Sequence, residues 1–338
     1  MKKSFGFLPS GAESFLYTIA AGGITAQVTD YGANLVNLLV PDRSGQVADV
    51  VLGFDSAAGY AASGESIGAT VGRNANRIQG AAFHIGDTEV RLTANENGNN
   101  LHSGPDVYNK RMWEVEEHTP SSITLRLDSP HGDQGFPGNA VIRVTYRLDD
   151  EKGLHILYEA VCDRDTVFNM TNHSYFNLAG HDRPARCMEQ LLTIPGAYFM
   201  PDDAENIPTG EIRSVANTPM DFRTAKPIGR DIDTDYECLN LQGGFDHNWV
   251  VANDPCAVLE DPVSGRVMEV STDLPGIQFY AGNFLKDEPG KNGTVYPKRS
   301  GICLETQYYP DAVHHPLWPQ PITKAGDRYR TETVYRFK

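Results

Sequence analysis

Short segments rich in β-branched and aromatic residues recur along nearly the whole chain, and turn-forming residues separate them. The clearest cover residues 24–28, 34–40, 81–85, 122–127, 141–148, 154–161, 191–194, 248–251, 267–272 and 277–281. Turn material lies at 41–45, 149–153 and 261–265, and the last of these indicates a hairpin. Helical periodicity is scarce, and residues 55–62 supply a turn or two of helix. Many strands with little helix predict packed antiparallel sheets, and hence an all-β sandwich.

The sequence shows no internal boundary that would divide it into domains. Its 338 residues can bury a large core without disulfides or metals, and large all-β proteins often form one unit at this length. Residues 198–241 are rich in Pro, Asp and Thr but contain no Gly/Ser linker, so we expect long loops over one sheet there. We therefore expect a single domain over residues 1–338.

Charge and cysteine usage restrict the partners and the compartment. A formal net charge of −15 argues against nucleic acid or an anionic membrane as a partner, because both require a basic surface. The five cysteines are scattered and form no Cys-x-x-Cys pair, which argues against a zinc site or a disulfide framework. Residues 4–14 lack the apolar core of a signal peptide, and no run is long enough to span a bilayer. We expect a cytoplasmic protein, as a monomer or a homodimer.

Residues 171–178, with the sequence Thr-Asn-His-Ser-Tyr-Phe-Asn-Leu, form the most informative polar segment. If this segment is a strand, His173, Tyr175 and Asn177 share one face, and Phe176 and Leu178 point to the other. Such a strand is anchored in a core and presents an imidazole, a phenol and an amide. Histidine suits proton transfer near neutral pH, although a single histidine in a strand is more often a hydrogen-bonded structural residue.

Residues 301–308 repeat this arrangement around an acidic side chain. Ile302 and Leu304 fall on one face, with Glu305 and Gln307 on the other. A carboxylate in an apolar strand is costly unless it is paired or solvated, so the strand borders a cleft, a solvated face or a buried ion pair. The nearby His314-His315 pair lacks the spacing of helical metal ligands, and we expect no metal site.

Three further segments combine cations, amides and histidines, at residues 72–78, 99–105 and 245–249. Fixed donors of these types can select the orientation of sugar hydroxyls. Taken singly, the first two are compatible with surface loops, and the third with the edge of a core strand.

Taken together, the segments resemble the motifs of the aldose 1-epimerase (galactose mutarotase) family. Residues 72–78 resemble its Gly-Arg-x-Ala-Asn-Arg-Ile element. Asn100-Leu101-His102, which follow Asn99, resemble its Asn-x-Leu-His element. The remaining matches, in the family's order, are Asn-His-Ser-Tyr-Phe-Asn-Leu at 172–178, Asp-His-Asn at 246–248, the segment around Gln278, and Glu-Thr-Gln-x-x-Pro-Asp-Ala at 305–312. The resemblance covers nearly the whole chain.

The resemblance implies a fold, an activity and a set of site residues. The implied fold is a β-supersandwich without metal or organic cofactor. Glu305 is implied as the general base and His173 as the general acid. The implied sugar-binding residues are Asn76, Arg77, His102, Asp246 and Gln278, with Ser174 and Tyr175 lining the same site.

The chain departs from the family pattern at two positions. Ser103 stands where the family usually has glycine, which places a hydroxymethyl group in a tight turn. Asn74 stands where an aromatic or aliphatic residue is common. Neither change removes a reacting group, but both bear on sugar preference and turnover.

The expected function is therefore interconversion of the α and β anomers of free aldohexoses such as glucose and galactose. The small-molecule aldose is the expected partner. Three alternatives remain open: a non-catalytic sugar-binding or regulatory protein, a glycosidase using Asp246 and Glu305 as its two carboxylates, and a hexose-6-phosphate 1-epimerase. The last requires a basic phosphate pocket, and no additional Lys/Arg cluster accompanies the motifs.

Overall fold

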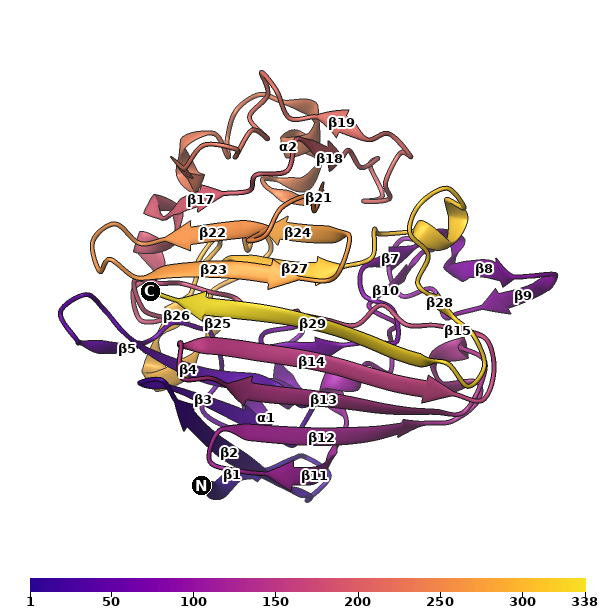
Figure 1. Ribbon diagram of the computed structural model, residues 1–338, viewed down its shortest axis with the longest axis horizontal. Helices are drawn as coiled ribbons and strands as arrows, with labels where there is room; N and C mark the ends of the chain where they lie inside the picture. Colours follow the sequence, from indigo (N-terminus) through magenta and orange to yellow (C-terminus); the bar gives the residue numbers. More distant parts are fainter.

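The computed structural model describes residues 1–338, and its main element is a nine-stranded antiparallel sheet. In Figure 1 this sheet runs from β17 near the top to β11 at the bottom. Its strands, in spatial order, are β11 (Glu114–His118), β12 (Ser122–Ser129), β13 (Ala140–Leu148), β14 (Gly153–Cys162), β29 (Arg328–Phe337), β23 (Val267–Thr272), β22 (Ala257–Glu260), β17 (Leu191–Thr193) and β20 (Lys226–Pro227).

Two five-stranded sheets pack behind the nine-stranded sheet. The N-terminal sheet contains β1 (Lys2–Phe7), β2 (Glu13–Ala21), β3 (Ile24–Thr29), β4 (Leu35–Pro41) and β5 (Val47–Asp49). The second, which we call the site sheet, has the order β19 (Arg213–Ser214), β18 (Tyr198–Met200), β21 (Asp246–Val250), β24 (Gly276–Tyr280) and β27 (Cys303–Gln307).

Hydrogen bonds join both small sheets to the large one. Tyr146 of β13 donates its hydroxyl hydrogen to the carbonyl oxygen of Ala33, between β3 and β4, over 2.8 Å. Tyr335 of β29 donates to the carbonyl oxygen of Leu304 in β27 over 2.9 Å. These layers confirm the expected all-β sandwich.

Two short helices and five two-stranded pairs complete the fold. The helices α1 (Ala57–Ala62) and α2 (Glu237–Gln242) are short. Two-stranded pairs are β6 (Ala69–Val71) with β16 (Thr171–His173), β7 (Arg77–Ile78) with β10 (Asn100–Leu101), β8 (Ala82–Ile85) with β9 (Thr88–Arg91), β15 (Thr166–Val167) with β28 (Ile322–Thr323), and β25 (Glu288–Pro289) with β26 (Val295–Tyr296). No helix has the length and apolar composition needed to cross a membrane.

The β-rich segments expected from the sequence all coincide with strands, and residues 261–265 join the β22–β23 hairpin as expected. The segment 171–178 is shorter as a strand than its alternation predicts, because β16 ends at His173. Beyond it, Phe176 forms only single bridges, to Val51 and to Ile302. Residues 198–241 also differ from the expectation of loops alone, since they contain β18, β19, β20 and the start of α2.

An aromatic layer supports the site sheet from its core side. Phe245 and Phe279 stack with ring centroids 5.1 Å apart, and Phe222 packs edge-on against both. Trp249 is fully buried in the same layer. Because large buried rings contribute much of a core's stability, this layer fixes the strands on which polar side chains project from the opposite face.

Candidate active site

One wall of the candidate site is the outward face of β21, β24 and β27. In the register of these strands Gln278 lies opposite Glu305, and Asn248 lies opposite Gln278. Side chains two residues apart share a face, so Glu305 shares its face with Cys303 and Gln307. The sheet therefore holds the polar side chains on a rigid surface, as the alternation in 301–308 predicts.

The opposite wall comes from β16 and from the β7–β10 pair. His173 is the last residue of β16, and Arg77 lies opposite Leu101 in the β7–β10 ladder. Asn76 and His102 flank that ladder, and each has a positive φ, 59° and 51° respectively. Left-handed backbone is uncommon outside glycine, and such residues cluster at functional sites.

The two walls enclose a polar cavity of about 170 Å³. Its lining is rich in hydrogen-bonding groups, which suits a small polar ligand. The lining residues are Gly64, Glu65, Ser66, Asn76, Arg77, Glu96, Leu101, His102, His173, Tyr175, Asp246, Gln278, Tyr280, Phe284 and Glu305.

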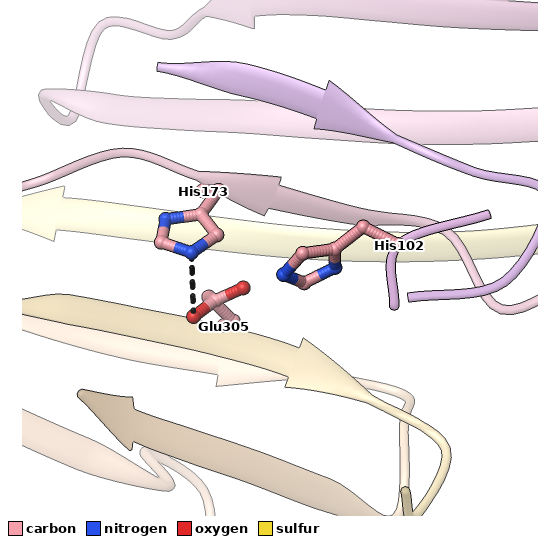
Figure 2. Close-up of side chains that lie close together, drawn as sticks. All are labelled: His102, His173 and Glu305. Atoms are coloured by element: carbon pink, nitrogen blue, oxygen red, sulfur yellow. Dashed lines mark ion pairs between the residues drawn. The ribbon is translucent and has the colours of Figure 1, made fainter. Parts of the chain in front are cut away.

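His173 and Glu305, which both line this cavity, face each other (Figure 2). His173 Nε2 lies 3.6 Å from Glu305 Oε1, and both side chains are buried. Burial lowers the pKa of His173 to about 4. Burial, and then the negative charge of Asp246, raise the pKa of Glu305 well above its usual value. Both shifts favour the neutral forms, so the pair holds a single proton over a wide pH range.

The ring of His173 is fixed by its neighbours. It stacks on Tyr175 with a centroid separation of 5.1 Å and an interplanar angle of 23°. Its other nitrogen, Nδ1, lies 3.4 Å from the thiol sulfur of Cys303. Contacts on the ring face and on Nδ1 direct Nε2 toward Glu305.

His102 is held as a neutral hydrogen-bond donor. Its Nδ1 accepts the backbone N–H of Asn76 over 3.1 Å, so the proton of the neutral ring resides on Nε2. Burial, followed by the charges of His173 and Arg77, lowers the pKa of His102 well below its usual value.

Ligand atoms of His102, His173 and Glu305 all lie within 4.8 Å of one another, a donor set that can hold a divalent metal. A metal requires a free lone pair on each nitrogen. The Asn76 contact commits the His102 lone pair on Nδ1 to the backbone and leaves Nε2 protonated. The arrangement therefore favours proton transfer over metal binding.

A chain of amides orients Asp246. Gln307 donates to Gln278 Oε1 over 3.2 Å, and Gln278 donates to Asp246 Oδ1 over 2.8 Å. Burial raises the pKa of Asp246, while Arg77 and the Gln278 hydrogen bond oppose that shift. Asp246 thus presents an oriented acceptor beside the His173–Glu305 pair.

The structure brings together eight of the nine side chains expected from the sequence: Asn76, Arg77, His102, His173, Tyr175, Asp246, Gln278 and Glu305 all line the cavity. Ser174 does not line it. Its hydroxyl donates to Asn172 Oδ1 over 2.6 Å inside the protein, because its side chain leaves the backbone on the opposite side from those of its neighbours His173 and Tyr175.

The two positions that depart from the family pattern contact each other. Ser103 Oγ accepts the backbone N–H of Asn74 over 2.8 Å and donates to the carbonyl oxygen of Asn74 over 3.0 Å. Ser103 has φ +58°, a region that favours glycine, and its buried hydroxyl is fully satisfied. The hydroxymethyl group therefore ties the His102 turn to residues 72–78.

Several lining residues were not expected from the sequence. Tyr280 lies two residues from Gln278 on the same strand, so alternation alone could have found it. Glu65, Glu96 and Phe284 come from segments without strand periodicity, and nothing in their local sequence indicates the cavity.

Comparison with known proteins shows the family to which a chain with this site belongs. Residues 16–336 match the family model described as aldose 1-epimerase. The chain belongs to the aldose 1-epimerase family. It is 39% identical to the galactose mutarotase of Mus musculus over 98% of this chain and 97% of the relative. It is 37% identical to the aldose 1-epimerase of Haemophilus influenzae at the same coverage.

Solved structures agree with the sequence relatives. The aldose epimerase homologue from C. elegans superimposes with a TM-score of 0.89 at 34% identity, covering 96% of this chain and 99% of that one. The galactose 1-epimerase from Lactobacillus acidophilus gives a TM-score of 0.87 at 26% identity, covering 100% and 98%. The expected family, fold, isomerase class and mutarotase function are confirmed by these comparisons.

Proposed function

We propose that this chain interconverts the anomers of free aldohexoses, with Glu305 and His173 as its acid–base pair. The observation that carries the proposal is the buried contact of 3.6 Å between His173 Nε2 and Glu305 Oε1 within a polar cavity. One carboxyl and one imidazole that share a proton supply the base and the acid that opening a hemiacetal requires.

The reaction begins with the pair in its charged form. Glu305 removes the proton of the anomeric hydroxyl as protonated His173 donates to the ring oxygen. The bond between C1 and the ring oxygen breaks, and the electron pair of the anomeric O–H bond forms the aldehyde C=O. Rotation about C1–C2 presents the other face of the aldehyde, and ring closure reverses both proton transfers.

Burial of the pair favours the stage of the reaction at which the sugar is open. When the sugar is open, Glu305 is a neutral carboxylic acid and His173 a neutral imidazole. The pKa of Glu305 is raised and the pKa of His173 is lowered, both mainly by burial, so the cavity favours these two forms. While the sugar ring is closed, the pair is charged, and the short distance between His173 and Glu305 stabilises the two opposite charges. The site thereby lowers the free energy of the open-chain intermediate relative to the bound ring.

The remaining side chains are suited to hold the sugar during rotation. Arg77 and the Nε2–H of His102 are donors, and Asp246 is an oriented acceptor. Asn76 is fixed by its backbone and by donation of the Arg77 N–H to Asn76 Oδ1 over 2.9 Å. Gln278 and Tyr175 complete this set of proposed sugar contacts.

Polarimetry on freshly dissolved α-D-glucose, α-D-galactose and α-D-xylose tests the function and ranks the sugars. We expect catalysed approach to the equilibrium rotation, first order in enzyme, for at least one aldohexose. Binding of the sugars without any acceleration would instead support a non-catalytic sugar-binding protein.

The pH profile of kcat/KM tests the shared proton. We expect an acid limb near pH 4, set by the lowered pKa of His173, and an alkaline limb set by the raised pKa of Glu305. At a pH below the acid limb the His173–Glu305 pair holds two protons, and at a pH above the alkaline limb it holds none. The neighbouring titratable groups are His102, Arg77, Asp246, Cys303, Tyr175 and Tyr280. An alkaline limb at the usual histidine pKa of about 6.5 would contradict the shared proton.

We also propose that residues 1–338 work as one domain in the cytoplasm. The largest buried apolar cluster extends from Tyr17 to Phe337, which supports a single unit. All five cysteines are unpaired and buried, which fits a reducing compartment. The proposed acid–base pair and sugar contacts all come from this chain, which fits either a monomer or a homodimer.

A further inference from the structure

The residues that line the cavity include far more acidic than basic side chains. Four carboxylic residues line it, Glu65, Glu96, Asp246 and Glu305, and the single Lys or Arg among the lining residues is Arg77. A substrate that carries its own negative charge therefore depends on Arg77 for any compensation.

Arg77 is already occupied by a carboxylate of the protein. Its Nε lies 2.5 Å from Glu96 Oε2, and its Nη2 lies 3.1 Å from Glu96 Oε1. This paired contact is bidentate, the geometry in which a guanidinium binds carboxylates and phosphates well. The Arg77 side chain is 9% exposed and that of Glu96 is 28% exposed, so the pair is only partly open to solvent.

The position of Glu96 is fixed by its own turn. The backbone N–H of Glu96 donates to the carbonyl oxygen of Asn99 over 3.2 Å, and the N–H of Asn99 donates back over 2.7 Å. On the other side, Arg77 lies in the β7–β10 ladder opposite Leu101. Both partners are anchored in backbone structure, although they are 19 residues apart in the sequence, so the carboxylate is built into the site.

Glu96 leaves part of the guanidinium available. No protein atom accepts a hydrogen bond from Arg77 Nη1, and Arg77 lines the cavity. Nη1 can donate to a hydroxyl oxygen of a sugar, which needs one donor and no net charge. The Nε–Nη2 edge, which could clamp a carboxylate or a phosphate, is already occupied.

We propose that Glu96 is a specificity-determining residue that restricts this site to uncharged aldoses, because it fills the anion-binding edge of Arg77. Hexuronates and aldose phosphates share the anionic chemistry that Glu96 excludes. This inference rests on the proposed function for its kinetic test, and equilibrium binding tests it separately.

The test compares D-galactose with D-galacturonate, which differ at C6 by a carboxylate. Polarimetry gives kcat/KM for both sugars, and calorimetry gives their dissociation constants, for the unmodified protein and for Glu96→Gln. We expect the unmodified protein to prefer galactose strongly. In Glu96→Gln we expect the ratio of galacturonate to galactose, in kcat/KM and in affinity, to rise about tenfold or more, since a paired cation becomes free for the substrate. The gain should shrink with added salt.

Two matched variants distinguish the effect of the Glu96–Arg77 ion pair from the effect of cavity charge alone and from a loss of folding. Glu96→Asp keeps the charge with a shorter side chain and should still reject galacturonate. Glu65→Gln removes a lining carboxylate that makes no ion pair with Arg77, and should raise the ratio less than Glu96→Gln does.

The inference is overturned if Glu96→Gln changes kcat/KM and affinity by the same factor for both sugars, since Glu96 then only positions Arg77. It is also overturned if Glu65→Gln raises the ratio equally, or if the unmodified protein accepts galacturonate as readily as galactose. Selective binding without turnover of either sugar would leave the role of Glu96 intact and reject the proposed function instead.

Discussion

Glu305→Gln is expected to lower kcat/KM for mutarotation about a thousandfold or more while the protein remains folded. A general base of this kind contributes about 10²–10⁴-fold, and the amide cannot accept the anomeric proton. Glutamine keeps the size of the side chain and its place opposite Gln278 in the β24–β27 register. Polarimetry on α-D-galactose measures the loss, and circular dichroism verifies the fold.

The stability of the same variant separates a catalytic role from a structural one. Burial raises the pKa of Glu305, so the ionised carboxylate is costly where it lies. We therefore expect Glu305→Gln to melt at the same temperature as the unmodified protein or higher. Glu114→Gln, at an exposed position on β11, provides the control and should retain activity and stability. A fall in melting temperature that accounts for the lost activity would argue that Glu305 is structural.

The strands of this fold were predictable because their signal is local. Alternation or β-rich composition identified segments such as 122–127 and 267–272, and both lie within strands of the large sheet. The extent of β16 was not predictable, since residues after His173 alternate as a strand would. Their backbone partners are isolated groups at Val51 and Ile302, contributed by segments far away in the sequence.

The residues 72–78 show where local sequence stops being informative about the site. Arg73 and Arg77 are both arginines of one polar segment, and each is suited to sugar binding. Arg73 is instead fully buried and donates to the carbonyl oxygens of Ser129, Pro137 and Gly138. Arg77 lines the cavity. Motif resemblance distinguished the two, whereas residue type did not.

Side-chain direction and distant partners were equally hidden. Ser174 directs its hydroxyl to Asn172, although both of its chain neighbours line the cavity. Glu96 belongs to an Asn-rich turn with no periodicity, and its ion-pair partner Arg77 lies in β7, which pairs with β10. Such contacts depend on tertiary structure, and the sequence alone contains no local signal for them.

His173→Asn is expected to lower kcat/KM by about 10²–10⁴-fold, because asparagine cannot transfer a proton to the ring oxygen. Its amide can still donate a hydrogen bond, so sugar affinity should change far less than kcat. Polarimetry and calorimetry on α-D-galactose provide the two measurements. A comparable loss in affinity and in kcat/KM would indicate that His173 binds the sugar without transferring a proton.

The same substitution also changes how stability depends on pH. The pKa of His173 is about 4 in the folded protein and about 6.5 when unfolded, so the unfolded state binds more protons between these values. His173 therefore contributes stability above pH 6.5 that is lost as the pH falls toward 4, by up to about 3 kcal/mol. We expect His173→Asn to lose less stability than the unmodified protein on acidification over this range, measured by denaturant unfolding. His84→Asn, at an exposed histidine of β8 outside the cavity, provides the matched control for removal of a histidine.

The double variant tests whether the two residues act as one proton-transfer unit. If Glu305 and His173 exchange a single proton through the sugar, loss of either residue already prevents the cycle. Glu305→Gln combined with His173→Asn should then be no slower than the slower single variant, because residues that act as a unit are strongly non-additive. Multiplicative losses in kcat/KM would mean that each group acts independently, and the shared-proton mechanism would have to be abandoned.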